Sequence, residues 1–166
     1  MPDISILPVW QQQQHYPAIV EDAKTLWNRR GALPQGVSAE ERANQLCAVA
    51  YCDGEMLGVS TVGMGTLPSL PRCRLGFLRV LVAPEHQLRG VGLARTMSVS
   101  SRDVLEQWSR DNPGERLLGM AALIESPELA QQSKRLFWPE SRLALVGYTA
   151  GGRQIRVVWF AHARLE

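Results

Sequence analysis

Residues 78–94 combine the residue types that a phosphate-binding turn needs. An apolar run ends at Pro84, and Gly90 and Gly92 stand at the start of an apolar pattern with helical spacing. The first four amides of a helix have no partner within it, and the helix dipole adds partial positive charge there. A strand that leads through a glycine turn into a helix can therefore bind a phosphate or pyrophosphate group. The missing Cβ of each glycine lets a ligand approach the backbone and permits a positive φ.

The spacing excludes two common phosphate-binding loops. A Walker loop ends in Gly-Lys-Ser/Thr, whereas Gly92 is followed by Leu93 and Ala94. A dinucleotide-binding turn needs a third glycine at position 95, which is Arg95. The pattern that remains is Val82-x-Pro84-x-x-Gln87-x-x-Gly90-x-Gly92. The alternative interpretation is an ordinary strand–helix turn whose glycines serve packing.

Hydrophobic periodicity and turn residues predict the elements that position this turn. Strands are expected at 4–10, 47–52, 56–62, 74–83, 117–124, 143–149 and 154–161, and helices at 17–30, 38–46, 90–108 and 127–136. Ser38 and Glu41 have the spacing of a capping box, and Asp53-Gly54 predicts a hairpin. Pro8 predicts that the first strand is an edge strand, because proline lacks a ladder donor.

The motif and the element order together resemble the GNAT superfamily of N-acetyltransferases, whose acyl-CoA signature is Gln/Arg-x-x-Gly-x-Gly/Ala. The resemblance covers nearly the whole chain. It implies an α/β (α+β) fold with a mixed, mostly antiparallel central sheet of about seven strands, flanked by about four helices. It also implies that residues 1–166 form a single GNAT-like acetyltransferase domain.

The resemblance further implies acetyl-CoA as co-substrate and no metal. The pyrophosphate is expected on backbone amides of the glycine turn, and the pantetheine arm on amides of Leu81 and Val82. The acetyl carbonyl would accept a backbone N–H near Val82. The cofactor-binding residues implied in this way are Leu81, Val82, Gln87, Leu88, Arg89, Gly90, Val91, Gly92, Leu93 and Ala94. Arg89 either contacts a phosphate or is a solvated surface arginine.

The usual acid and base of the family do not carry over to this chain. Many relatives place a glutamate six residues before the Val82 position, where this chain has Gly76. Relatives often use a tyrosine in the last helix as the acid, and the matching position is Phe137. Polar groups that could replace them lie beside the turn or in later strands: Tyr148, Ser126, His86 and Glu85. The leading interpretation is a chain of waters without a dedicated side-chain base.

Acyl transfer needs an amine with a free lone pair, so the expected acceptor is a primary amine of a small molecule or a peptide. Trp27 in the first helix and Arg79 in the central strand are the candidates for contacting it. Trp27 alternatively belongs to the core by its helical spacing. Arg79 alternatively extends to solvent or pairs with a carboxylate.

Composition narrows the class of protein. The chain has 166 residues, of which 45% are hydrophobic and 20% charged, and this balance is typical of a globular protein. The net charge of +2 with scattered basic residues gives no reason to expect nucleic acid. Cys47, Cys52 and Cys73 lack metal-ligand spacing and indicate reduced thiols. With no secretion signal and no membrane-spanning run, we expect a cytoplasmic monomer or homodimer without a membrane partner.

The function expected from the sequence is direct transfer of an acetyl group from acetyl-CoA to a primary amine. The alternative is a non-catalytic acyl-CoA-binding sensor or regulatory module, which the missing glutamate and tyrosine favour. A purely structural protein would leave the spacing of Gln87–Gly92 unexplained.

Overall fold

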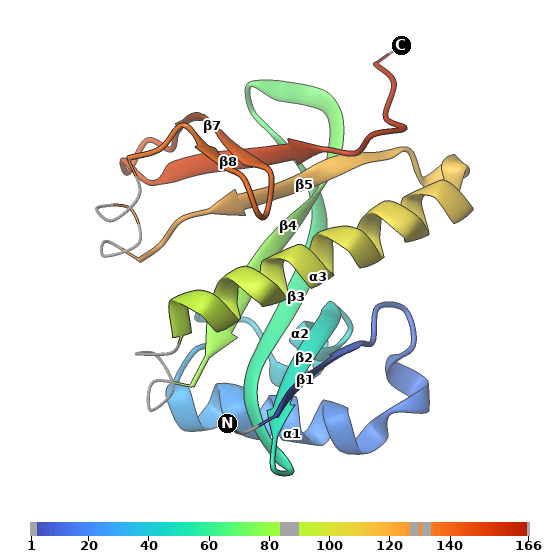
Figure 1. The fold of residues 1–166 in the computed structure, drawn as a ribbon, viewed down its shortest axis with the longest axis vertical. Coiled ribbons are helices and arrows are strands. Elements are labelled where there is room, and N and C mark those ends of the chain that lie inside the picture. Colours follow the sequence, from blue (N-terminus) through green and yellow to red (C-terminus); the bar gives the residue numbers. More distant parts are fainter. Residues whose placement is uncertain (1–2, 84–89, 127–129, 131–133, 166) are drawn as a thin grey trace. The chain divides into compact units, whose positions relative to one another are not determined.

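The structure, a computed structural model, describes residues 3–83, 90–126, 130 and 134–165 (Figure 1). The helices are α1 (Pro17–Arg30), α2 (Ala39–Ala43) and α3 (Gly90–Asp111), with 3-10 turns η1 (Gln13–His15) and η3 (Pro113–Glu115). The strands are β1 (Ile4–Pro8), β2 (Leu46–Cys52), β3 (Glu55–Leu67), β4 (Leu70–Val82), β5 (Leu117–Leu123), β6 (Phe137–Trp138), β7 (Leu143–Tyr148) and β8 (Gln154–Trp159). Within these residues no helix is long and apolar enough to cross a membrane.

The strands form one sheet in the order β1-β2-β3-β4-β5-β8-β7-β6. The pair β4–β5 is parallel, while β1–β2, β2–β3, β5–β8, β8–β7 and β7–β6 are antiparallel. The predicted mixed, mostly antiparallel α+β fold is therefore confirmed. The sheet has eight strands where about seven were expected, and the described residues hold three α-helices where about four were expected.

The chain divides into two compact units. Unit 1 consists of Met1–Val62 and Val80–Val104, and unit 2 consists of Gly63–Arg79 and Leu105–Glu166. The elements β3, β4 and α3 each contribute residues to both units. The organisation of residues 1–166 as a single domain stays a prediction.

In unit 1, local sequence signals set the ends of most elements. α1 begins with Pro17 at a position where no backbone donor is needed, and it ends at Gly31 with a left-handed φ of 56°. α2 has the predicted capping box, in which Ser38 Oγ accepts from Glu41 N and Glu41 Oε2 accepts from Ser38 N, both at 3.1 Å. β1 is the edge strand that Pro8 predicts.

The predicted hairpin also forms, between β2 and β3. Asp53 and Gly54 take φ values of 50° and 81°, as a two-residue hairpin turn with two positive φ angles requires. One apolar core of unit 1 joins α1, α2 and the strands, and Figure 1 shows α1 beside these strands. Its members include Leu26, Trp27, Leu46, Val49 and Val59.

A buried pair of serines joins β3 to α3 within unit 1. Ser101 Oγ donates to the Met97 carbonyl oxygen at 2.8 Å, so the Ser60 hydroxyl is left to donate to Ser101 Oγ, also at 2.8 Å. Ser60 Oγ in turn accepts the Ala48 N–H of β2 at 3.0 Å. Both serines are fully buried, and each N–H and O–H group in this series of hydrogen bonds has an acceptor. The link therefore fixes the middle of α3 on β3 without leaving an unsatisfied polar group.

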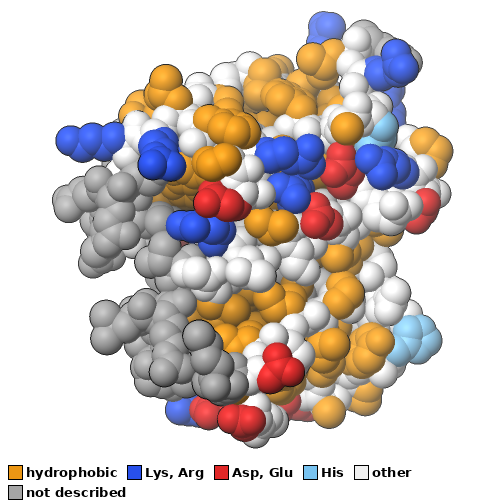
Figure 2. Space-filling model, viewed as in Figure 1, with side chains coloured by type: hydrophobic (Ala, Val, Ile, Leu, Met, Phe, Trp, Pro, Cys, Tyr) orange, Lys and Arg blue, Asp and Glu red, His pale blue; other side chains and the backbone are white. Residues whose placement is uncertain are grey.

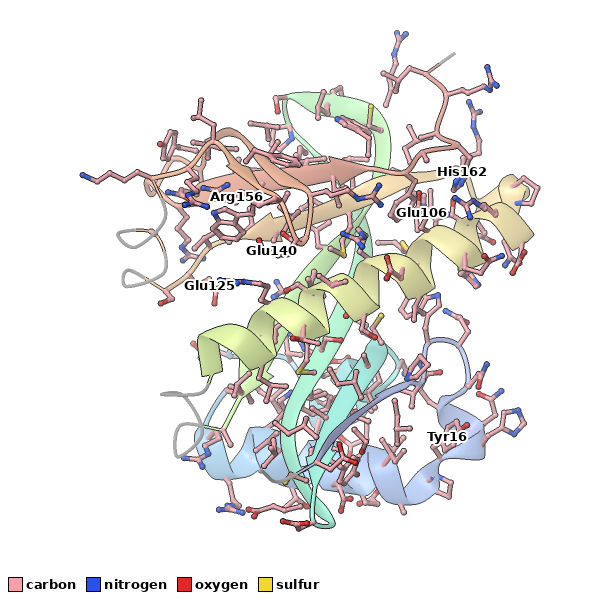
Figure 3. The ribbon with its side chains drawn as sticks, viewed as in Figure 1. Tyr16, Glu106, Glu125, Glu140, Arg156 and His162 are labelled. Carbon is pink, nitrogen blue, oxygen red and sulfur yellow. The ribbon has the colours of Figure 1, made fainter. Side chains whose placement is uncertain are left out.

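In unit 2, β5 lies between the parallel strand β4 and the antiparallel strand β8. One face of these strands carries a core of Leu75, Ala121 and Val157 together with Leu67. The buried Arg156 of β8 lies 3.8 Å from the ring centre of Trp138 in β6, an arrangement that stabilises a cation by its contact with an aromatic face. Figure 3 shows the Arg156 side chain in this part of unit 2.

The prediction for Phe137 was wrong. It lies in β6, opposite Ala144 of β7, and not in a last helix. Of the helix expected at 127–136, Ala130 is helical, and Leu136 is 72% exposed and non-helical. Residues 127–129 and 131–133 lie outside the described residues. A two-residue strand is missed because its identity depends on pairing with β7 and not on local pattern.

We expect Ser60→Ala to destabilise the protein by about 1–3 kcal/mol, because the buried Ala48 N–H loses its acceptor and Ser101 Oγ its donor. Urea unfolding of the variant beside wild type measures this difference. Ser5→Ala, the same change at an exposed position of β1, is the control and should shift stability by less than about 0.5 kcal/mol. Equal effects of the two variants would contradict the role of the serine link.

Candidate functional site

The end of β4 leaves backbone amides open at one edge. Ala83 N–H donates to the Leu57 carbonyl oxygen at 2.8 Å, toward β3. Because successive amides of an extended strand point to opposite edges, the N–H groups of Val80 and Val82 point away from β3. On that edge the ladder to β5 runs from Arg74 to Leu78 and includes neither valine. In the described part of the chain, β4 therefore offers two unpaired amides that a ligand with carbonyl or amide groups could bind.

Leu81 and Val82, the two residues predicted to bind the pantetheine arm, point their backbone N–H groups to opposite edges of β4. Leu81 N–H points toward β3, because Leu81 and Ala83 are two residues apart in the same strand. Val82 N–H lies on the open edge, where the sequence analysis expected a donor for the acetyl carbonyl. The open donors are therefore those of Val82 and Val80, while Leu81 packs its side chain against the core of unit 1.

The start of α3 is held beside this strand end by a small apolar cluster. Leu93 and Met97 of α3 are buried together with Val82 of β4, and Ala94 and Val80 pack against them. Gly58 of β3 makes this approach possible: a Cβ there would lie 2.8 Å from Met97 Sδ and 3.2 Å from the Leu81 carbonyl oxygen. An isolated glycine within a strand pattern indicates either a bulge or such a close approach, and this role of Gly58 was not predicted.

Gly92 in the first turn of α3 is exposed, and a Cβ built on it would meet no atom within 4 Å. Its φ is not positive, so neither packing nor backbone conformation requires a glycine there. Among the described residues, the space beside the Gly92 Cα is therefore open. This observation argues against the interpretation in which the glycine at position 92 serves packing, and it agrees with close approach of a ligand to the helix amides.

The other predicted cofactor-binding residues are only partly visible. Gln87, Leu88 and Arg89 lie outside the described residues, as do Glu85 and His86. Gly90 and Val91 are the first two residues of α3. The described part of the candidate site consists of the strand end at Val80–Val82 and the helix start at Gly90–Ala94, which the cluster around Leu93 brings together.

The candidate catalytic and acceptor-binding side chains differ in their exposure to solvent. Tyr148 is the last residue of β7 and is 61% exposed. Ser126 is exposed after the end of β5, and its carbonyl accepts the Ala130 N–H at 3.1 Å. Arg79 is exposed on β4. Trp27 is 4% exposed and packs in the core of unit 1, so its side chain is not available to an acceptor at the surface.

None of the three thiols has the surroundings of an activated nucleophile. Cys47 is fully buried, and this burial raises the pKa of its thiol to about 12. Cys73 is buried, and the half-buried Cys52 has its Sγ 3.6 Å from the Asp53 carboxylate, a neighbour that does not stabilise a thiolate. Within the described residues no three His, Cys, Asp or Glu side chains are grouped as a metal site. The cysteines therefore give no support to an acyl-cysteine intermediate.

Comparison with known proteins identifies the fold to which this chain belongs. No protein-family model matches the chain, and no curated protein matches it. Solved structures do match. A GNAT-family acetyltransferase from Streptococcus pneumoniae has a TM-score of 0.57 at 10% identity, over 96% of this chain and 100% of the other. The chain has the GNAT fold.

Two further solved structures that match this chain contain a bound cofactor or a bound protein segment. A proposed acetyltransferase from Salmonella typhimurium, solved with its cofactor acetyl-CoA, has a TM-score of 0.53 at 14% identity, over 98% of this chain and 96% of the other. A mutant of the AtaT toxin bound to the C-terminus of the antitoxin AtaR has a TM-score of 0.59 at 12% identity, over 95% of this chain and 92% of the other. The fold expected from the glycine turn and the element order is thus confirmed.

We expect Gly92→Ala to leave the fold intact and to raise stability by up to about 1 kcal/mol, because alanine has the higher helix propensity and its Cβ has open space. Thermal and urea unfolding measure this. Gly58→Ala is the contrasting variant, since its Cβ would press against Met97 and the Leu81 carbonyl. A clear loss of stability in Gly92→Ala would show that this glycine is structural.

We expect a thiol reagent to label Cys52 in the native protein and to reach Cys47 and Cys73 only after unfolding, because those two are buried. Mass spectrometry of the labelled peptides identifies the sites. Cys52→Ser should remove the fast native labelling. Rapid native labelling of Cys47 would contradict the burial on which its raised pKa depends.

Proposed function

We propose that this protein is an acetyl-CoA-dependent N-acetyltransferase that moves the acetyl group directly to a primary amine of a small molecule or a peptide. The observation that carries the proposal is the juxtaposition of the open Val80 and Val82 amides with the start of α3 at Gly90–Ala94. A free strand edge suits the amide-bearing pantetheine arm, and an open helix start suits the pyrophosphate. The GNAT fold and the acetyl-CoA complex of the Salmonella neighbour support the same assignment.

The proposed transfer uses backbone groups more than side chains. The neutral amine attacks the thioester carbonyl, a C–N bond forms, and the carbonyl oxygen gains negative charge in the tetrahedral intermediate. The Val82 N–H would donate to that oxygen, an oxyanion contact whose removal typically costs two or more orders of magnitude in rate elsewhere. The C–S bond then breaks, and the thiolate of CoA takes up a proton that the amine has lost.

No described side chain stands out as the base or the acid. Gly76, which the resemblance aligns with the family's glutamate, lies within the β4–β5 ladder opposite Met120. Phe137 lies in β6 and not in a helix, so it does not correspond to the family's helical tyrosine. We propose that water carries both protons, with Tyr148 and Ser126 as the side chains to test. The three free cysteines accord with a reducing compartment, and we propose a cytoplasmic location on that ground.

The second candidate is an acyl-CoA-binding sensor or regulatory module. The specific observation in its favour is Gly76, a glycine where the resemblance places the family's catalytic carboxylate. The AtaT neighbour bound to its antitoxin is a case in which a protein of this fold binds another protein. Both candidate functions require acyl-CoA binding at the end of β4 and the start of α3, and the variant Gly90→Asp tests this site. Measurement of turnover then distinguishes a transferase from a sensor.

We expect Gly90→Asp to abolish acetyl-CoA binding, because it adds a side chain and a negative charge at the helix start where the pyrophosphate would lie. Calorimetric titration measures the affinity, with Gly92→Ala expected to weaken it less. Gly114→Asp, a change of the same type at the exposed 3-10 turn η3, is the control for folding and net charge. Unchanged affinity in Gly90→Asp would remove the site assignment.

Release of free CoA across a library of amines then separates enzyme from sensor. Turnover with one class of amine supports the transferase, and binding without any turnover supports the sensor. Cys52→Ser protein serves as the enzyme in this assay, because its half-buried thiol would otherwise react with the reagent that detects CoA. Absence of acetyl-CoA binding would contradict both candidates.

A further inference from the structure

Arg79 of β4 is a charged side chain that the proposed function does not use. Side chains of a strand alternate between its two faces, so Arg79 lies on the same face of β4 as Leu75 and Phe77. Leu75 belongs to the buried core of unit 2, and the half-buried Phe77 packs against that core. Arg79 is exposed. The apolar series on this face of β4 therefore ends in a cation at the surface.

The neighbouring strands extend this face with apolar side chains. The ladder between β4 and β5 ends with the pair Leu78–Ala122, so Arg79 and Leu123 are the first residues beyond it. Leu123 is paired with Ile155 of β8, and Ile155 packs against the core of unit 2. Leu123 and Ile155 are both half-buried, so part of each side chain is in contact with solvent. Arg79 therefore lies at the border of a half-exposed apolar surface.

This surface is open beyond Ile155. Gly147 of β7 is paired with Ile155, and a Cβ built on Gly147 would meet no atom of the described residues within 4 Å. Half-buried apolar side chains are stabilised further when a ligand removes the rest of their surface from water. An apolar group of a ligand could therefore pack on Phe77, Leu123 and Ile155.

Arg79 differs from several other arginines of unit 2 in its electrostatic surroundings. Some of those lie 2.6–3.3 Å from a carboxylate: Arg74 with Glu115, Arg142 with Glu106, and Arg153 with Glu125. Figure 2 shows acidic and basic side chains next to one another on the face of unit 2 that it draws. No hydrogen bond or ion pair joins Arg79 to another residue in the described part of the chain. Its guanidinium group can therefore bind a carboxylate of a ligand through two parallel hydrogen bonds.

We propose that Arg79 is a specificity-determining residue that binds a carboxylate of the acceptor. The acceptor is then a short peptide with a free N-terminal amine, an apolar side chain and a free C-terminal carboxylate. The carboxylate pairs with Arg79, and the apolar side chain packs on Phe77, Leu123 and Ile155. This proposal rests on the proposed transferase function and names the class of its substrate.

The position of Arg79 along β4 sets the length of this acceptor. Arg79 lies three residues before Val82, whose N–H is the proposed donor to the acetyl carbonyl. The rise of a strand places the two residues roughly 10 Å apart along β4. An extended peptide of two to three residues spans about the same distance. We therefore expect dipeptides and tripeptides to be better acceptors than single amino acids.

The first test is an NMR titration with alanyl-phenylalanine and alanyl-alanyl-phenylalanine, each compared with its C-terminal amide. Amidation removes the carboxylate, and it leaves the amine unchanged because the two groups belong to different residues. We expect saturable shifts of the Leu123 and Ile155 amides with the free peptides, and at least tenfold weaker binding of the amidated peptides. Arg79→Gln should lose this preference. Arg79→Lys, which keeps the charge without the planar fork, should retain part of it.

Arg72→Gln is the matched control for this test. Arg72 is an exposed arginine of the same strand with no hydrogen bond or ion pair to another described residue, and it lies roughly 23 Å from Arg79 along β4. This variant should bind the peptides as wild type does. Absence of shifts with any of the peptides, equal binding of a peptide and its amide, or equal losses in Arg72→Gln and Arg79→Gln would each overturn the proposal.

Turnover distinguishes a failure of this proposal from a failure of the proposed function. With acetyl-CoA and Cys52→Ser protein, adding Arg79→Gln should raise KM for the free peptides at least tenfold and leave kcat/KM for the amidated peptides unchanged. Binding that prefers the free peptides without any turnover would support the carboxylate site and contradict the transferase. Turnover with equal kcat/KM for a peptide and its amide would support the transferase and overturn the role of Arg79.

Discussion

The close approach of α3 to β3 is the constraint on which the candidate acyl-CoA site depends. Gly58 leaves space for Met97, and the Ser60–Ser101 hydrogen bond fixes the helix one turn further on. Together they hold the start of α3 beside Val82, with Leu93 filling the space between them. A helix displaced by the thickness of one side chain would carry its free amides away from the strand end. Packing in the middle of the helix therefore decides whether its first turn and the open edge of β4 can bind the same ligand.

The solved structures of similar fold are only 10–14% identical to this chain, and a site of the kind we propose, built from backbone groups, would need few particular side chains. Unpaired amides at Val80 and Val82 and helix amides after Gly90 are supplied by chain geometry, and most side chains are compatible with them. What the geometry demands is local: a small residue where helix and strand meet, and no bulky group in front of the helix start. Gly58 and Gly92 meet these two demands, and the rest of the chain can vary as long as its apolar pattern remains.

Features set by residues close together in the sequence could be predicted, whereas features set by contacts between distant segments could not. Pro17, the Ser38–Glu41 box and Asp53-Gly54 act within a few residues, so the ends of α1, α2 and the first hairpin follow from sequence. β3 and β4 are longer than predicted, because pairing carries them past Gly63 and Pro71, residues that weaken a strand pattern. The open edge of Val82 depends on where the β5 ladder stops, and no local sequence pattern indicates that point.

If the protein is a transferase that binds acetyl-CoA but has no side-chain base, the range of amines that it can acetylate is limited. Without a side-chain base, the rate follows the fraction of acceptor that is already neutral. An α-amino group has an ordinary pKa of about 8 and a lysine side chain one of about 10.4, so near neutral pH the neutral fraction of the former is larger by roughly two orders of magnitude. Gly76 in place of a carboxylate therefore favours acceptors such as peptide termini or weakly basic small amines over lysine side chains. Gly76 is therefore compatible with a sensor, and if the protein is an enzyme it indicates a weakly basic amine as the substrate.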